Sequence, residues 1–265
     1  MPNNEKIAIL ISSCDAFSDL WEWHIKLLKQ NWVGQRIHVY FVTDKPTEKS
    51  YEGVEIIVAE GSMDFPMRIK YATQKIGAQY ILLTLDDYFL IDKVQAQRIE
   101  YLLSRVETEK IDYLSLYNRR RVNPKRYTPI EDLETIDLRQ KYAVTLYPAI
   151  WSADFLQKTV FEDLNAWQYE PTLTNTALKE NANCQFSRAG TFVILDVVRK
   201  GKILRKANKY FKNHGISIGD RPLVGRGMEM KLAIMDFINW YTPRWFYKML
   251  KKIAKKMGMK FYSED

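Results

Sequence analysis

The sequence is poor in cysteine and has no long apolar run. Its two cysteines, Cys14 and Cys184, lie far apart and lack the spacing of metal ligands. This usage is typical of a reducing compartment, and we expect both thiols to be small buried side chains. No apolar run approaches the ~20 residues that span a bilayer. The chain passes from Met-Pro-Asn-Asn-Glu-Lys straight into an apolar strand, so no signal peptide is expected. These absences favour a cytoplasmic protein.

Several motifs that carry common chemistries are also absent. No G-x-G-x-x-G follows the first apolar segment, and G-x-x-x-x-G-K-[ST] occurs nowhere. These absences argue against a dinucleotide-binding dehydrogenase and a P-loop nucleotidase. G-x-S-x-G and H-E-x-x-H are missing as well, which argues against a serine hydrolase elbow and a zinc protease. A bound nucleotide would have to be held by carboxylates, a metal and local backbone.

The most informative stretch that is present runs from Tyr80 to Ile91. Its first six residues are mostly apolar, which predicts a strand buried on both faces of a parallel sheet. Asp86 and Asp87 follow with no basic neighbour, and carboxylates in such a run are costly to bury unless they are paired. They either end the strand and cap the next helix, or they hold a ligand or divalent cation at the carboxyl edge of the sheet.

Strand and helix patterns alternate over the first 120 residues, which predicts an α/β fold with a mostly parallel, doubly wound sheet. Asp15 and Asp44 follow other predicted strands, so they share an edge with the Asp pair or act as local caps. His24 falls on an apolar helix face and is expected to be a core histidine. Strands are predicted at 7–11, 37–42, 54–59, 80–85 and 113–117, and helices at 18–31, 66–76, 93–106 and 171–185.

Two segments carry a resemblance to a known family. Ser12–Trp21 and Leu82–Leu90 resemble bacterial GT-A-type glycosyltransferases from polysaccharide gene clusters for capsule, exopolysaccharide or lipopolysaccharide. The resemblance covers roughly residues 7–170 and implies a single GT-A-like, Rossmann-like domain. In that family the first half binds a nucleotide-sugar, and a D-x-D-type motif holds its diphosphate through Mn²⁺ or Mg²⁺. Here the motif reads Leu85-Asp86-Asp87, with leucine in place of the first aspartate.

The resemblance implies roles for particular residues. The candidates for nucleotide-sugar binding are Asp15, Asp44, Arg68, Asp86 and Asp87. The candidates for metal binding are Asp86, Asp87 and a late histidine, His214, whose alternative is a surface loop position.

A catalytic base is expected further along the chain. Trp167-Gln-Tyr-Glu170 resembles a W-x-x-E element of these enzymes, so Glu170 is the candidate base and Asp163 the second choice, unless each is simply an exposed acid. The cations of 119–126 either face the anionic donor or acceptor or form a solvated loop. Trp151 either stacks on a ligand or packs in the core.

The end of the chain is basic and amphipathic. Residues 244–265 carry a net charge of +5, whereas the preceding 243 residues carry only +3. Over 243–258, apolar and lysine side chains fall on opposite faces of a predicted helix, which is typical of a helix lying on an anionic membrane. The alternative is a helix packed on the domain. We therefore predict a catalytic domain over 1–226 and a helical, membrane-associating tail over 227–265.

The resulting prediction is a glycosyltransferase that is peripheral on the inner face of the cell membrane. Its donor would be a nucleotide-sugar, a UDP-sugar first, and its acceptor a lipid-linked glycan or an oligosaccharide. One alternative is a nucleotidyltransferase acting on sugar phosphates, but the glycine-rich basic loop of those enzymes is missing. Another is a basic nucleic-acid-binding protein, but no RRM, KH or helix-turn-helix signature is present, so no nucleic-acid partner is expected.

Overall fold

The computed structural model describes residues 5–59, 61, 63–117, 133–161, 164–187 and 191–230. The chain divides into two compact units, residues 1–196 and 197–265. The tail predicted over 227–265 falls almost entirely outside the described residues. Its boundary at residue 226 and its helical, membrane-associating character therefore stay predictions.

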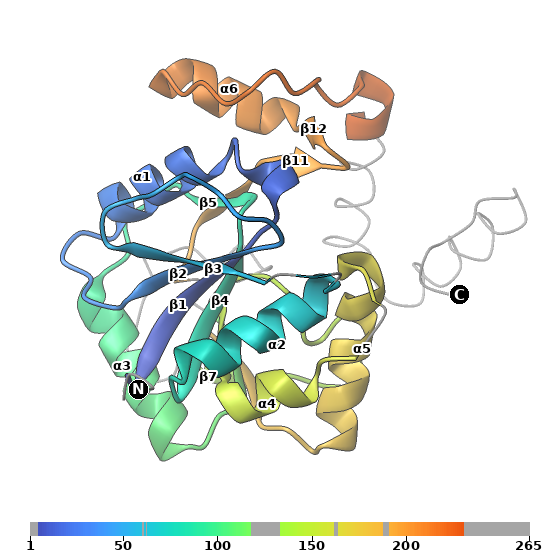
Figure 1. Ribbon diagram of the computed structural model, residues 1–265. Helices are drawn as coiled ribbons and strands as arrows, with labels where there is room; N and C mark the ends of the chain where they lie inside the picture. Colours follow the sequence, from blue (N-terminus) through green and yellow to red (C-terminus); the bar gives the residue numbers. More distant parts are fainter. Residues whose placement is uncertain are drawn as a thin grey trace, which may run out of the picture. The chain divides into compact units, whose positions relative to one another are not determined.

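The first unit is built on an eight-stranded sheet with the order β3-β2-β1-β4-β8-β6-β9-β7. Its first four strands, β1 to β4, are labelled in Figure 1. The strands β1 to β4 pair in parallel with their neighbours, and β8 enters antiparallel between β4 and β6. The mostly parallel α/β fold is therefore confirmed. The strands of this sheet are β1 Ile7–Ser12, β2 Val39–Thr43, β3 Val54–Val58, β4 Tyr80–Leu85, β6 Tyr113–Ser115, β7 Leu133–Thr135, β8 Ala149–Ser152 and β9 Cys184–Ser187.

Helices cover both faces of the sheet, which explains the continuous apolar runs. In β1, Ala8 and Leu10 enter the core beneath α2, α4 and α5, while Ile9 and Ile11 enter the core beneath α1 and α3. Because successive side chains of a strand point to opposite faces, a strand between two helical layers must be apolar throughout. The helices of this unit are α1 Trp21–Asn31, α2 Phe65–Ile76, α3 Ala96–Thr108, α4 Ala153–Lys158 and α5 Ala166–Lys179.

The limits of α2 follow from its local sequence. The Asp64 carboxylate accepts a hydrogen bond of 3.0 Å from the N–H of Met67 and so caps the helix. Pro66 occupies the first turn, where its missing N–H costs nothing. Gly77 ends the helix in the left-handed conformation at φ 68°. The helix predicted to open at Pro66 and to end at Ile76 is confirmed.

Three helices differ from their predicted limits. α3, predicted over 93–106, spans Ala96–Thr108. A 3₁₀ turn over Asp15–Phe17 precedes α1, which begins three residues later than predicted. The helix predicted over 171–185 is α5, which begins at Ala166. Asn165 and Gln168 cap this start reciprocally, each side chain accepting from the other's backbone N–H at 3.0 Å. The last residues of the predicted helix belong to β9.

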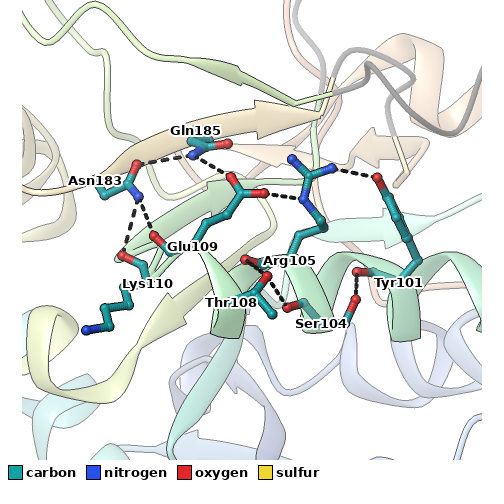
Figure 2. Close-up of polar contacts among 8 residues, drawn as sticks. All are labelled: Tyr101, Ser104, Arg105, Thr108, Glu109, Lys110, Asn183 and Gln185. Atoms are coloured by element: carbon teal, nitrogen blue, oxygen red, sulfur yellow. Dashed lines mark hydrogen bonds and ion pairs between the residues drawn. The ribbon is translucent and has the colours of Figure 1, made fainter.

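A polar network joins the end of α3 to the start of β9 (Figure 2). The Arg105 guanidinium bonds the Glu109 carboxylate and donates to the Tyr101 hydroxyl at 2.7 Å. Gln185 then donates to Glu109 at 3.3 Å, and Asn183 donates to the Glu109 carbonyl at 2.9 Å. The hydrogen bond from Arg105 holds the pKa of Glu109 below its usual value. The network keeps the helix end and the strand in register.

Two short strands extend the first unit beside the Asp pair. β5 (Tyr88–Leu90) follows Asp87 directly and pairs antiparallel with β10 (Ile194–Asp196). The register places Asp196 opposite Tyr88. This contact joins positions more than 100 residues apart in sequence and brings an additional carboxylate to the end of β4.

The second unit begins with a hairpin of β11 (Val198–Arg199) and β12 (Lys202–Ile203). Lys200 and Gly201 form the turn of this hairpin, both with positive φ. The basic stretch that follows is a helix, α6 (Arg205–His214), because Ala207 and Phe211 bury one face of it. In the part of the chain that is described, no helix has the length and apolar character needed to cross a membrane.

Candidate functional site

The carboxyl ends of β1, β2 and β4 meet at one edge of the sheet. Ser12 is in register with Val42 and with Leu85, so the residues after these three strands lie side by side. The backbone N–H of Asp15 donates to the Asp44 carboxylate at 2.6 Å, which joins the first two strand ends directly. Asp15, Asp44 and the Asp pair are thus brought to the same edge, as a parallel sheet requires.

Asp86 serves as an anchor for the turn after β4. It is only 7% exposed, and its carboxylate accepts a hydrogen bond from the Ser13 hydroxyl. The Ser13 hydroxyl in turn accepts from the Trp21 indole at 2.6 Å. The backbone N–H of Asp86 donates to Ser12 at 3.2 Å. One carboxylate oxygen of Asp86 is therefore committed to holding the turn against β1 and α1.

His24 also helps to hold the turn after β4 in place. Its side chain is 2% exposed and its Nδ1 donates to the backbone carbonyl of Asp86 at 3.1 Å. The rings of Phe41 and Phe89 pack edge-on against it at 5.9 and 5.7 Å between centroids. Burial lowers its pKa to about 4. His24 is the core histidine that the sequence predicted.

This buried histidine predicts a specific loss of stability in acid. The unfolded chain takes up a proton at His24 below pH 6.5, whereas the folded chain resists it until about pH 4. The stabilisation is therefore complete above pH 6.5 and falls by about 3 kcal/mol as the pH drops towards 4. Denaturant unfolding at several pH values should show a steeper acid loss for the native protein than for His24→Gln. His214→Gln, which changes an exposed histidine, should keep the native slope. Equal slopes for the native protein and His24→Gln would contradict the assignment.

Asp87 lies in a second group of acidic and aromatic side chains. The Tyr88 ring stacks on Tyr147 at 5.1 Å and 12°, and Tyr147 stacks on Tyr117 at 4.3 Å and 18°. Burial raises the pKa of the Tyr88 hydroxyl well above its usual value, and Tyr147 raises it further. The negative charges of Asp87, Asp196 and Glu170 also raise the pKa of Tyr88. Tyr88 is therefore a neutral O–H at neutral pH, within electrostatic reach of three carboxylates.

Glu170 reaches this group from α5. Its Oε1 accepts a hydrogen bond of 3.3 Å from the backbone N–H of Leu146, the residue before Tyr147. A role for Glu170 at the same site as Asp87, 83 positions earlier in the sequence, was predicted only through the family resemblance. Asp196 and the stack of Tyr88, Tyr117 and Tyr147 were not predicted at all. The aspartate that follows the apolar run 191–195 was a usable signal for Asp196.

Arg68 lies near the strand ends that carry Asp15 and Asp44. Burial alone would raise the pKa of Asp44, but the N–H groups of Asp15 and of Asp44 itself, together with the Arg68 charge, bring it below its usual value. The Arg68 Nη1 donates to the carbonyl of Met63 at 3.0 Å. Its Nε is buried and has no hydrogen-bond partner within the described ranges. A buried donor without an acceptor fits a ligand oxygen.

The remaining predicted residues are placed as follows. Trp151 is fully buried and meets Tyr113 edge-on at 4.6 Å, so it packs in the core. His214 ends α6 in the second unit, where it is exposed, stacks on Tyr210 and bonds the Tyr210 carbonyl at 2.8 Å. Its metal role stays a prediction. Asp163, the cations of 119–126 and the segment 243–258 lie outside the described residues, as does the side chain of Trp167.

The carboxylates at this edge of the sheet are the groups that could hold a divalent cation. Within the described ranges, no group of three or more His, Cys, Asp or Glu side chains is arranged to hold a metal by itself. A hydrated Mg²⁺ or Mn²⁺, however, needs only one or two carboxylates when substrate phosphates supply further oxygens. Asp87 directly precedes Tyr88, and Asp196 lies opposite Tyr88 in the β5–β10 pairing, so these two carboxylates are the residues that could contribute to such a site.

The fold belongs to the GT-A-like class of Rossmann folds. Among solved structures, the chain is similar to S. aureus TarS, residues 1–349 in complex with UDP-GlcNAc. That match has a TM-score of 0.51, 15% identity, and covers 75% of this chain and 60% of that one. A longer S. aureus TarS structure matches with a TM-score of 0.50 and 14% identity, over 74% of this chain and 37% of the other. The chain thus spans less than two thirds of the length of each of these neighbours. No protein-family model and no curated protein sequence matches it.

Proposed function

We propose that the protein is a glycosyltransferase that uses a nucleotide-sugar donor. The observation that carries the proposal is that two groups of side chains converge at one edge of a GT-A-like sheet. The first group, around Asp44 and Arg68, lies on the side proposed for the nucleotide. The second group is acidic and surrounds Asp87 and Glu170. In open α/β sheets, ligands bind beyond the carboxyl ends of the strands. The two groups suit the two ends of a nucleotide-sugar.

The nucleotide would occupy the side formed by the ends of β1 and β2. Arg68 offers its buried Nε donor there, and Asp44 offers a carboxylate whose lowered pKa keeps it ionised at neutral pH. Asp15 shapes this side through its N–H bond to Asp44. A UDP-sugar is the first donor to test, because the TarS neighbour was solved with UDP-GlcNAc.

The diphosphate would lie beside the turn after β4. Asp87, with Asp196 near it, would hold Mn²⁺ or Mg²⁺, and such an ion would neutralise the charge that develops on the leaving diphosphate. Asp86 would contribute mainly by fixing the turn, because one of its oxygens already accepts from Ser13.

Sugar transfer requires a base at the acceptor hydroxyl. In the inverting reaction that we propose, the acceptor oxygen attacks the anomeric carbon while the bond from that carbon to the diphosphate oxygen breaks. The nucleoside diphosphate leaves with the electron pair, and Glu170 takes the proton of the hydroxyl. The Leu146 N–H orients Glu170 for this task. Asp163 stays the second candidate base.

The acceptor that we propose is a lipid-linked glycan or an oligosaccharide used in cell-surface polysaccharide synthesis. The basic amphipathic sequence over 243–258 would hold the enzyme at the anionic inner face of the membrane that carries such an acceptor.

The experiment that tests the proposed function is a screen of nucleotide-sugars for turnover. The protein is incubated with each donor and Mn²⁺ or Mg²⁺, with UDP-GlcNAc first, and the released nucleoside diphosphate is measured. Release from at least one donor supports the proposal. Absence of release from every donor, with and without oligosaccharide acceptors, would overturn it.

A further inference from the structure

Positive charge is concentrated in the second unit of the chain. Residues 1–196 carry a net charge of −4, whereas residues 197–265 carry +12. This excess does not come from the terminal segment alone. The described residues 197–230 contain nine basic and two acidic side chains, a net charge of +7. An excess of this size on one small unit is an electrostatic feature that needs an explanation beyond folding.

The lysines of α6 gather on one face of the helix. Lys206, Lys209 and Lys212 recur at three-residue spacing, and all three are exposed. Ala207 and Phe211 lie on the opposite face and are buried. The helix is therefore packed through its apolar side, and its basic side faces solvent.

Within the described residues, no acidic side chain pairs with these lysines. None of the three makes an ion pair or a hydrogen bond in the part of the chain that the structure describes. Glu229 is committed to Arg205, with 3.3 Å between Nε and Oε2. Three like charges on adjacent turns repel one another, and an external anion would relieve this repulsion.

The same unit also exposes apolar side chains. Leu223, which bridges to Ile203 of the hairpin strand β12, is 40% exposed, and Met230 is 65% exposed. An anionic lipid surface offers both a negative potential for lysine and an apolar layer for such side chains. A nucleic acid offers a charged backbone instead, and its recognition commonly uses arginine forks and stacked aromatic side chains. The combination of lysines and exposed aliphatic side chains favours the lipid surface.

We propose that the basic face of α6, formed by Lys206, Lys209 and Lys212, docks on membranes rich in anionic phospholipid. This surface acts in addition to the amphipathic sequence over 243–258, and it does not depend on the reaction proposed above. Each lysine close to an anionic surface contributes about a fivefold gain in binding, so the three together give about 100-fold. The contribution weakens with salt.

The test compares three full-length proteins in cosedimentation with vesicles of equal parts phosphatidylcholine and phosphatidylserine. We expect the variant K206Q/K209Q/K212Q to bind about 100-fold more weakly than the native protein at low salt. The matched control K29Q/K158Q/K179Q removes three exposed lysines of the first unit and should bind as the native protein does. Thermal unfolding of all three proteins checks that the fold is intact, since these exposed positions contribute little to stability.

Three results would overturn the proposal. The first is native binding by the α6 variant while a fourth protein, the variant K251Q/K252Q/K255Q, loses binding, which would place docking wholly in the terminal segment. The second is an equal loss in the first-unit control, which would indicate non-specific charge attraction. In the third, the α6 variant binds vesicles as the native protein does but no longer binds oligonucleotides. This result would show that the basic face of α6 binds nucleic acid.

Discussion

Asp87→Asn is expected to lower kcat at least ~100-fold, equivalent to about 2.7 kcal/mol of transition-state stabilisation. Asparagine keeps the size of the side chain but removes the negative charge that would hold a divalent cation against the donor diphosphate. The measurement is the release of nucleoside diphosphate at saturating donor, with Mn²⁺ and with EDTA. Asp92→Asn makes the same chemical change at an exposed position five residues further on and should leave turnover unchanged.

The neighbouring carboxylate separates a functional effect from a structural one. Asp86→Asn removes the buried charge that accepts from Ser13, so we expect it to lower the melting temperature as well as activity. Asp87→Asn, by contrast, should melt close to the native protein. Unchanged turnover in Asp87→Asn, or equal turnover with EDTA and with Mn²⁺, would remove Asp87 from the metal site.

Glu170→Gln is expected to lower kcat by ~100-fold or more while the Kd for the donor stays unchanged. The glutamine carbonyl oxygen can still accept from the Leu146 N–H, so the segment before Tyr147 should keep its place. Only the ability to take a proton is lost. Single-turnover kinetics measures the rate of the chemical step, and titration with the donor measures its Kd, so the two effects can be separated.

A surface glutamate close to Glu170 in sequence provides the control for this variant. Glu180 follows α5 directly and pairs with Lys158 at 3.3 Å on the surface. Glu180→Gln should therefore keep native turnover. If Glu170→Gln retained most of its kcat, the base would have to be reassigned, and Asp163→Asn would be the next variant to measure.

The edge of the sheet could be predicted because its signals are local. Each of β1, β2 and β4 is a short apolar run followed by a polar residue, and parallel pairing brings such ends together regardless of what lies between them. The same reasoning predicted that His24 lies in the core, since its position on the apolar face of α1 implies burial.

Contacts between distant segments could not be predicted in this way. Asp196 reaches the site only because β10 pairs with β5, and nothing in the sequence of either strand specifies the other as its partner. The different tasks of Asp86 and Asp87 also depend on tertiary structure, because the Ser13 hydroxyl that engages Asp86 comes from another strand end. α6 was not predicted as a helix because it has only two buried apolar residues, Ala207 and Phe211, too few to give a clear helical pattern among its lysines.

The central claim is that the protein transfers a sugar and releases a nucleoside diphosphate. The most direct test is to identify the product formed from an accepted nucleotide-sugar, using chromatography that resolves nucleoside diphosphate, nucleoside monophosphate and pyrophosphate. We predict nucleoside diphosphate and free or transferred sugar, both abolished together in the Asp87→Asn protein. Formation of pyrophosphate from a nucleoside triphosphate and a sugar phosphate, with no diphosphate released from any nucleotide-sugar, would contradict the account and identify a nucleotidyltransferase instead.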